Sequence, residues 1–373
     1  MKIINIYLDN KLISCDTITP LALEIVKKRP SIRVNFYVFD KNTFLNITRS
    51  KILNDAIFEV GKIKYFGWIY SSNKYLRKTF YIFNILEIIL KSYFHDVYSF
   101  HFKALEVFPY SLIYFFNKKK TFLIENNCWG HFSVMDKIFE IFFQKKSIRK
   151  FKKYKNAVYF GDEWPQLNYL KNINKQDIYK ISPTRLMKTW INFANKQKSV
   201  TKEKRVLIIL GYLGKHHVYS KTTTGAELLK KTLDIVLKNT NYTVTLKPHI
   251  ITDNKQLIDI LEKFNTNRIS ISYNHVYHLA LSHFITISNY ASLAMPDAWI
   301  AGSNVIEYNK YDKEIMLLCK NKSPYYMYVD HFINNNPLML KTCLKSIKKI
   351  KTRKIDLFKT KKRTDDLITK ICS

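Results

Sequence analysis

Residues 244–308 decide the fold that this sequence predicts. The stretch opens with VTLKPHI (244–250) and, after a spacer, closes with SHFITISNYASLAMPDAWIAGSNVIEY (282–308). Its apolar runs are typical of buried strands, and the segment before Gly302 has the length of a helix. The alternation of strands and helices predicts a parallel α/β unit.

Two polar turns mark the expected functional edge of this unit. The first is Lys247-Pro248-His249, and the second covers residues 288–292. Each turn follows a strand, and the carboxyl ends of parallel strands meet at one edge of the sheet. Ligands of open α/β sheets bind outside that edge. We therefore expect both turns to face one pocket.

The same alternation of strands and helices continues through the rest of the chain. Further strands are predicted at 2–8, 32–39, 96–100, 121–125, 158–160, 205–210 and 242–246, and helices at 20–28, 75–93, 104–116 and 226–237. The polar run NFANKQKSVTKEK (192–204) has no hydrophobic period and is typical of a linker. The sequence thus predicts α/β domains over 1–191 and 205–340, a cleft between them, and a basic helical tail over 341–373.

The composition indicates an acidic partner. The chain has 62 Lys and Arg against 29 Asp and Glu, a net charge of +33, although base composition contributes to the abundance of Lys. Nucleic acid, anionic lipid, and an anionic sugar polymer or nucleotide remain open. Five scattered cysteines and the absence of an N-terminal signal-peptide pattern favour a reducing cytoplasm. The most apolar run, 81–90, is shorter than the roughly 20 residues of a membrane span.

Lys247 and His249 could hold a phosphate or a sugar carboxylate, because one supplies charge and the other a hydrogen bond. The alternative is a solvated surface turn in which Pro248 ends the strand. Ser288 and Ser292 could add an anion site at a helix N-terminus, or Ser292 could only cap that helix.

Pro296 must lie in the first turn of the same helix, because proline deeper in a helix is destabilising. Asp297 then also lies in the first turn, either as a partner of the helix dipole or as an acceptor for a hydroxyl group.

A third loop, GYLGKHH (211–217), follows the strand at 205–210. Gly211 and Gly214 could let the backbone approach a phosphate, and Lys215 adds charge, although the spacing matches no standard nucleotide motif. The adjacent histidines lack the further ligands of a metal site, so we expect no metal.

The first domain offers candidates for general acid or base chemistry and for acceptor binding. Glu125 and His131, in the segment ENNCWGH after a predicted strand, could act as the base on an acceptor hydroxyl. Asp162, Glu163 and Arg185 are further cleft candidates. Structural turns are the alternative for 125–131 and 161–163.

Basic clusters interleaved with apolar residues at 118–120, 145–155 and in the tail favour contact with an anionic membrane, or are solvated surfaces. The tail could instead pack back across the domains. No nucleic-acid-binding motif is present, so nucleic acid is not expected as a partner.

Three segments together resemble the GT-B glycosyltransferases that build bacterial surface polysaccharides, in particular transferases of CMP-activated acidic sugars and CDP-glycerol polymerases. ISPTRLMKTW (181–190) resembles a G-x-x-R-x-D segment without its Gly and Asp. Lys247-Pro248-His249 resembles a K-P-H-P turn, with Ile250 in place of the last proline. Residues 288–302 resemble an S-x-S…E-A…G segment in which Asp297-Ala298 replaces Glu-Ala.

The resemblance implies two Rossmann-like domains facing a cleft, with the acceptor on the first and the nucleotide-sugar on the second. It implies that His249, Ser288 and Ser292 hold the nucleotide phosphate and that Asp297 holds the ribose. We expect a transferase without a cofactor that uses a glycan or lipid-linked acceptor, and no metal ion, because helix N-termini and cationic side chains can stabilise the leaving phosphate. The basic clusters favour a peripheral location on the inner face of the cytoplasmic membrane. A glycerophosphotransferase and a non-catalytic basic binding protein are the alternatives.

Overall fold

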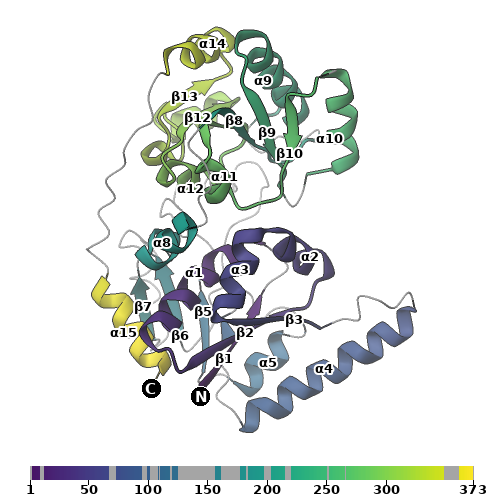
Figure 1. Cartoon of the computed structure of the whole chain (residues 1–373), viewed down its shortest axis with the longest axis vertical. Coiled ribbons are helices and arrows are strands. Elements are labelled where there is room, and N and C mark those ends of the chain that lie inside the picture. The colour runs from purple at the N-terminus through teal and green to yellow at the C-terminus, as the bar shows by residue number, and fades with distance from the viewer. Residues whose placement is uncertain are drawn as a thin grey trace. The chain divides into compact units, whose positions relative to one another are not determined.

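The computed structural model describes most of the chain and divides it into two compact units. It describes residues 2–8, 12–66, 73–94, 99–100, 108, 110–117, 120–124, 156–160, 177–181, 184–196, 203–214, 220–249, 252–264, 266–347 and 361–372. Unit 1 comprises Met1–Gly130, Lys150–Ala194 and Asp356–Ser373, and unit 2 comprises His131–Arg149 and Asn195–Ile355. Each unit is an α/β structure and is described by itself (Figure 1).

Unit 1 contains two parallel sheets that meet where β1 contacts β4. The first has the order β1 (Lys2–Leu8), β2 (Ile32–Val38), β3 (Gly61–Tyr65), and the second the order β4 (Ser99–Phe100), β5 (Thr121–Ile124), β6 (Asn156–Phe160), β7 (Asp177–Ile181). The described helices of its N-terminal segment are α1 (Leu12–Lys28), α2 (Lys41–Arg49), α3 (Lys51–Val60), α4 (Lys74–Phe94) and α5 (Tyr110–Phe116). The predicted strands at 2–8, 32–39, 121–125 and 158–160 are confirmed over their described residues. Of the strand predicted at 96–100, only β4 at its end lies within the described residues, and β3 and β7 are additional.

Helix α1 begins eight residues before the predicted start at Pro20. Proline is favoured in the first helical turn, where its missing N–H group costs no hydrogen bond. The structure instead has Pro20 inside the helix, because the preceding turns bury Cys15, Ile18 and Thr19. Tertiary burial thus outweighs the local preference of proline.

Unit 2 contains one six-stranded parallel sheet with the order β10-β9-β8-β11-β12-β13. Its strands are β8 (Glu203–Ile209), β9 (Thr243–Lys247), β10 (Ile269–Ile271), β11 (His283–Ser288), β12 (Asn304–Asn309) and β13 (His331–Asn334). The chain builds β8, β9 and β10 outward in one direction and then returns to the other side of β8 to form β11. This is the strand order of doubly wound nucleotide-binding sheets, and their ligands bind where the direction reverses.

Helices cover both faces of this sheet (Figure 1). They are α9 (Gly225–Asn239), α10 (Asn254–Leu261), α11 (Val276–Ala280), α12 (Met295–Ile300), α13 (Lys313–Leu318) and α14 (Pro337–Ser346). Side chains from β8, β11 and β12 pack with α9 and α14 in one core, which includes Ile208, Ile287 and Leu229. A Thr224–Glu227 capping box starts α9. It satisfies two backbone N–H groups and fixes the helix start.

The predicted linker at 192–204 is longer than the segment between α8 and β8 in the structure. Helix α8 (Lys188–Lys196) continues into it and buries Trp190 and Ala194, which lie four residues apart on one face. Strand β8 begins at Glu203, earlier than predicted. The polar surface of α8 concealed its helical period, so only residues 197–202, which lie outside the described residues, remain between α8 and β8.

The predicted tail at 341–373 is not one structural element. Helix α14 starts at Pro337 and packs against α9, burying Leu340 and Leu344 in unit 2. Helix α15 (Lys361–Cys372) packs against β7 and buries Leu367 and Ile371 in unit 1. The chain therefore returns to its first unit, as in the alternative in which the tail packs back across the domains.

Candidate functional site

The two polar turns lie at the same edge of the unit 2 sheet, as predicted. Ser288 of β11 pairs with Ile209 of β8, which in turn pairs with Lys247 of β9. These residues form one row at the carboxyl ends of adjacent strands. The row lies where the strand order reverses, so the loops that follow β8, β9 and β11 form the candidate site.

Thr252 ties the loop after β8 to the turn after β9. Its Oγ1 donates a hydrogen bond to the carbonyl of Gly211 (3.0 Å) and accepts one from the backbone N–H of His249 (2.8 Å). The N–H of Thr252 returns a bond to the carbonyl of His249 (2.9 Å). Thr252 is buried and was not among the predicted site residues. Its position shortly after the KPH turn was the one available signal, because Thr often bonds nearby backbone in turns.

His249 presents a neutral imidazole at this edge. Desolvation by the surrounding protein, followed by the charge of Lys247, lowers its pKa from 6.5 to about 4. The residue still has an exposed surface, which weakens desolvation. The direction of the shift is sufficient to make the ring neutral at pH 7. The imidazole can then donate one hydrogen bond and accept another.

Lys247 supplies the positive charge next to this ring. Its Nζ donates to the carbonyl of Pro248 (3.2 Å), which directs the ammonium group along the turn. An anion placed here would interact with a full charge from Lys247 and with a hydrogen bond from His249. A nearby anion would also raise the pKa of His249, because an opposite charge favours the protonated ring.

Ser288 is not available to a phosphate, contrary to the prediction. It is fully buried, and its Oγ donates to the carbonyl of Tyr290 (2.5 Å). The Oγ of Ser292 accepts a hydrogen bond from the N–H of Ala294 (3.1 Å). The hydroxyl groups of Ser288 and Ser292 are therefore both used in hydrogen bonds that shape the turn at 288–292. Ser292 is partly exposed.

Gly211 makes room for Tyr290. A Cβ atom at Gly211 would lie 2.6 Å from ring atoms of Tyr290, so only glycine permits this contact. In the structure, Gly211 therefore allows two loops to pack closely, whereas the prediction was that it lets the backbone approach a phosphate. At Gly214, a Cβ atom would lie 2.5 Å from the end of the Tyr212 ring. Lys215, His216 and His217 lie outside the described residues.

Asp297 is also turned into the protein, contrary to its predicted contact with a ribose. It is 1% exposed in the first turn of α12, and its charge contributes, after desolvation, to raising the pKa of Tyr277 on α11. Its place in the first turn is as predicted, since Pro296 occupies N1 or N2. The packing of α12 on α11 decides its direction. Gly302 ends this segment at a positive φ of 79°, which favours glycine.

Glu307 is a buried carboxyl group that the sequence analysis treated only as part of a strand. It lies on β12 beside Ser288 and is fully buried. The hydroxyl of Tyr311 and, more weakly, the amide of Asn309 donate hydrogen bonds to its Oε1. Burial raises its pKa. A lone acidic residue within the apolar run NVIEY was the signal that could have identified it.

Arg185 is not exposed to a cleft, contrary to the prediction. It lies in the short 3-10 helix Thr184–Leu186, is 2% exposed, and pairs with Asp16 of α1 at 3.8 Å. The guanidinium group therefore helps to hold α1 within unit 1. The candidates Glu125, His131, Asp162 and Glu163 lie outside the described residues. Among the residues that are described, no group of three or more His, Cys, Asp or Glu side chains could hold a metal ion.

Comparison with known proteins shows the fold. No family model matches the chain, and no curated protein matches its sequence. Among solved structures, the UDP-GlcNAc 2-epimerase of Methanocaldococcus jannaschii is similar with a TM-score of 0.56 at 12% identity, covering 100% of this chain and 99% of the other.

Two further structures agree with this result. The UDP-N-acetylglucosamine 2-epimerase of Rickettsia bellii has a TM-score of 0.55 at 12% identity, with 100% and 96% of the two chains covered. Arabidopsis thaliana UGT89C1 in complex with UDP has a TM-score of 0.50 at 9% identity, with 100% of both chains covered. With its parallel sheets and these neighbours, the chain has the GT-B fold.

Proposed function

We propose that the protein is a glycosyltransferase that takes a sugar from a nucleotide-activated donor to a glycan or lipid-linked acceptor. The observation that carries this proposal is the row formed by Ser288, Ile209 and Lys247 at the point where the strand order of unit 2 reverses. Lys247 belongs to this row, and His249 follows it two positions later in the chain. They supply a cation and a neutral hydrogen-bonding ring where such sheets bind nucleotides.

The chemistry assigned to this pair is stabilisation of the leaving nucleotide. Breaking the bond between the sugar and the phosphate places negative charge on the phosphate oxygen. A cation and a hydrogen-bond donor already positioned at that oxygen lower the barrier, because they need no reorganisation during the reaction. Lys247 is assigned the cationic part and His249 the hydrogen bond. Activity that persists in EDTA is the corresponding expectation for a metal-independent enzyme.

The donor is proposed to be a CMP-activated sugar, as the sequence resemblance implies. The names of several structural neighbours instead contain UDP or UDP-GlcNAc, which makes a UDP-sugar the second candidate. The same names raise a second reaction, epimerisation at carbon 2 of the sugar. A CDP-glycerol donor would make the enzyme a glycerophosphotransferase. All of these donors present a phosphate next to a nucleoside, so Lys247 and His249 suit each of them.

A thermal-shift panel with CMP, CDP, UDP, GDP and ADP tests the site and ranks the nucleotides. Ligand binding to the folded state raises Tm by mass action. We expect one nucleotide to raise Tm of the wild type, and His249→Ala to weaken its binding by roughly tenfold, as expected for a hydrogen bond to a charged group.

His331→Ala is the matched control for this experiment. His331 begins β13, at the amino end of a strand in the same sheet, so the same chemical change is made away from the proposed site. Unchanged nucleotide affinity in His249→Ala, with the fold checked by circular dichroism, would contradict the proposal.

Product analysis separates the reactions. The protein is incubated with CMP-sugars, UDP-GlcNAc or CDP-glycerol, each with and without a polysaccharide or lipid-linked acceptor. Release of the nucleotide that depends on the acceptor supports transfer of a sugar or of glycerol phosphate, according to the donor consumed. An altered sugar that remains attached to UDP in the absence of acceptor would instead indicate epimerisation. Nucleotide binding without turnover of any donor would indicate a binding protein.

A further inference from the structure

The loop after β8 and the turn after β11 begin at the point where the strand order of unit 2 reverses. Ile209 ends β8 and pairs with Ser288, which ends β11, so the two segments start from neighbouring positions. Helix α9 leads from the first segment toward β9, and α12 leads from the second toward β12. In doubly wound sheets, ligands bind in the crevice between two such segments.

Tyr290 occupies this crevice. A Cβ atom at Gly211 would lie 2.6 Å from Cγ and Cδ2 of Tyr290 and 2.9 Å from its Cβ. Carbon atoms in ordinary contact are about 3.5–4.0 Å apart. Only glycine at position 211 lets the ring come this close to the loop after β8. The ring therefore fills the space between the two segments, and the side chain is partly exposed.

Hydrogen bonds fix the backbone next to Tyr290. The hydroxyl group of Ser288 donates to the carbonyl of Tyr290 (2.5 Å). The buried amide of Asn289 donates to the carbonyl of Tyr308 on β12 and to the hydroxyl group of Thr232 on α9, both at 2.9 Å. The sheet and α9 thus set the position of this backbone, and the ring can leave the crevice only by a change of its own rotamer.

The loop after β8 has two backbone donors that a phosphate could use in an open crevice. The carbonyls of Gly211 and Leu213 face the protein, where they accept hydrogen bonds from the side chain of Thr252 and from the first turn of α9. A trans peptide bond directs its N–H group away from its carbonyl, so the N–H groups of Tyr212 and Gly214 point the other way. Within the described part of the chain, neither N–H group has a hydrogen-bond acceptor.

Lys247 and His249 lie on the other side of the loop after β8, because β9 pairs with β8 on the side opposite β11. Lys247 is partly exposed and His249 is exposed. One phosphate group can therefore reach this pair while the ring of Tyr290 fills the crevice. One cation and one hydrogen-bonding ring match the charge and the acceptors of a single phosphate.

We propose that Tyr290 is a specificity-determining residue that limits the site to donors with a single phosphate group. That phosphate binds at Lys247 and His249, and the ring of Tyr290 keeps a second phosphate out of the crevice. Nucleoside monophosphate donors such as CMP-activated sugars fit this site, whereas nucleoside diphosphate donors such as UDP-sugars and CDP-glycerol do not. The inference rests on the proposed function, because it takes Lys247 and His249 as the phosphate-binding pair.

The test compares the affinities of the full chain for CMP and CDP, and for UMP and UDP, by isothermal titration calorimetry in EDTA. The wild type is expected to bind each diphosphate no more tightly than its monophosphate. Tyr290→Ala opens the crevice, so CDP should bind about tenfold more tightly than CMP, as expected for a hydrogen bond to a charged group. The affinity of this variant for CMP should stay that of the wild type.

Two control variants show whether the ring itself is responsible. Tyr290→Phe keeps the ring and should keep the wild-type ratio of the two affinities. Tyr273→Ala removes a tyrosine that follows β10 at the same edge, where its hydroxyl group bonds to Asn254, and should leave the ratio unchanged.

Circular dichroism checks the fold of each variant. If Tyr290→Ala does not fold, Tyr290→Leu replaces it, because leucine keeps the contact with Gly211 but lacks the outer part of the ring. This variant should shift the ratio in the same direction.

Three results would overturn the inference. They are a wild type that binds CDP about tenfold or more tightly than CMP, a Tyr290→Ala variant with an unchanged ratio, and a Tyr290→Ala variant that binds both nucleotides more weakly. The last result would show that the ring stacks on the ligand. If the wild type and all variants bind none of the four nucleotides, the proposed function fails, and this inference fails with it.

Discussion

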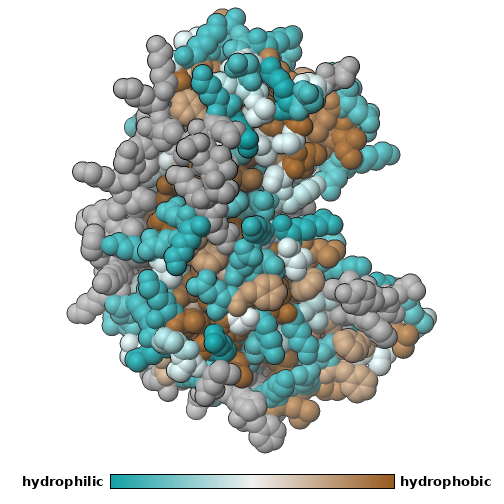
Figure 2. Space-filling model, in the orientation of Figure 1, coloured by the Kyte–Doolittle hydropathy of each residue, from teal (hydrophilic) through white to brown (hydrophobic). Residues whose placement is uncertain are grey.

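At the carboxyl edge of β8, β9 and β11, polar side chains point into the protein, whereas on α4 large apolar side chains point out of it. Ser288, Asp297 and Glu307 are buried at or near the first region, while Phe83 and Leu90 are exposed in the second. Buried polar groups and exposed apolar patches are the informative exceptions in a folded protein. The first region uses polar groups to set a precise arrangement of loops, and the second leaves apolar side chains exposed on a helix whose other side is in the core (Figure 2).

The largest expected effect tests whether the two sides of α4 contribute differently to the free energy of unfolding. Ile85→Ala removes a side chain that is 3% exposed and should lower the free energy of unfolding by about 2–5 kcal/mol. Phe83→Ala should change it by less than about 0.5 kcal/mol, because its side chain packs on little protein. Chemical denaturation of both variants measures the difference. A comparable loss in Phe83→Ala would mean that the outer face is packed, and the contrast with the sheet edge would then fail.

A pair of glycine substitutions tests how tightly the loops at the sheet edge are packed. A Cβ atom at Gly225 would lie 2.0 Å from the backbone oxygen of Tyr212. Gly225→Ala should therefore cost about 1–3 kcal/mol of unfolding free energy by overpacking. Gly214→Ala is the control, since its Cβ would meet only the end of the Tyr212 ring, which is partly exposed and can move. Equal Tm values for the two variants would show that the edge is loosely packed.

A smaller effect concerns the inward-facing carboxyl group of Glu307. Burial raises its pKa in the folded state above the ordinary value of 4.5. Its stabilising contribution is then complete below the unfolded pKa and is lost as the pH rises through the folded pKa. Glu307→Gln cannot ionise, so its Tm relative to the wild type should increase with pH. Tm measured across acid to neutral pH gives this difference, and parallel curves would show that the pKa of Glu307 is the same in the folded and unfolded states, which would contradict the raised pKa.

The smallest expected effect concerns His249, the outward-facing member of the same edge. Its folded pKa is lowered to about 4 from 6.5. Stability that depends on the neutral ring is present above about pH 6.5 and is lost as the pH falls toward 4. Solvent exposure should limit this loss to less than about 1 kcal/mol. His249→Ala should flatten the slope of unfolding free energy against pH in this window, and an unchanged slope would contradict the lowered pKa.

Much of unit 2 could be predicted because its determinants are local. The apolar runs of β8, β9, β11 and β12 define strands, and their alternation with helices defines a parallel sheet. The position of both polar turns at one edge follows from parallel pairing. The sequence pattern did not predict how many polar groups at this edge remain available to a ligand. The side chains of Ser288 and Asp297 can point outward or inward without any change in that pattern.

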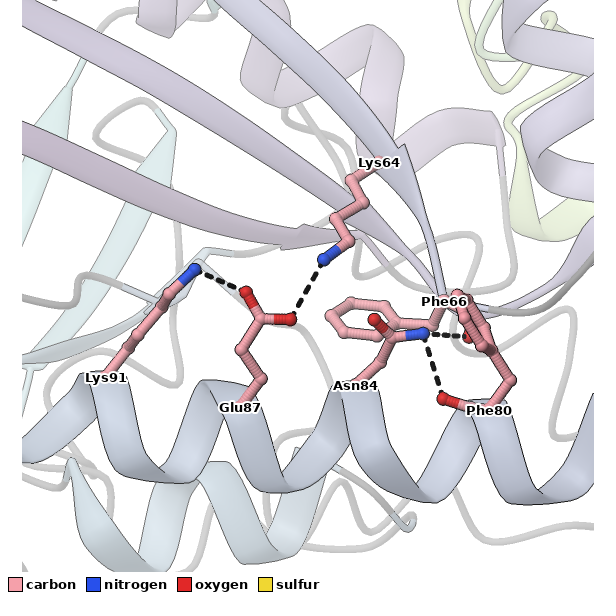
Figure 3. Close-up of polar contacts among 6 residues, drawn as sticks. All are labelled: Lys64, Phe66, Phe80, Asn84, Glu87 and Lys91. Atoms are coloured by element: carbon pink, nitrogen blue, oxygen red, sulfur yellow. Dashed lines mark hydrogen bonds and ion pairs between the residues drawn. The ribbon is translucent and has the colours of Figure 1, made fainter.

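Unit 1 was predicted less completely for a related reason. The length and period of α4 identify a helix, but an apolar stripe on each side does not specify which one packs on β3. Asn84 and Glu87 settle this through contacts with Phe66 and Lys64, which are distant in the sequence (Figure 3).

The sequence by itself determined the alternating α/β order, the strands β8, β9, β11 and β12 of the unit 2 sheet and the shared edge of the two polar turns, because hydrophobic period and parallel pairing are properties of short segments. It did not predict the edge strands β10 and β13 of that sheet. Only the tertiary structure decided that Ser288 and Asp297 are buried, that one face of α4 is exposed, and that α15 returns to unit 1. Each of these depends on packing between segments far apart in the chain, where burial of apolar surface and satisfaction of hydrogen bonds outweigh local preference.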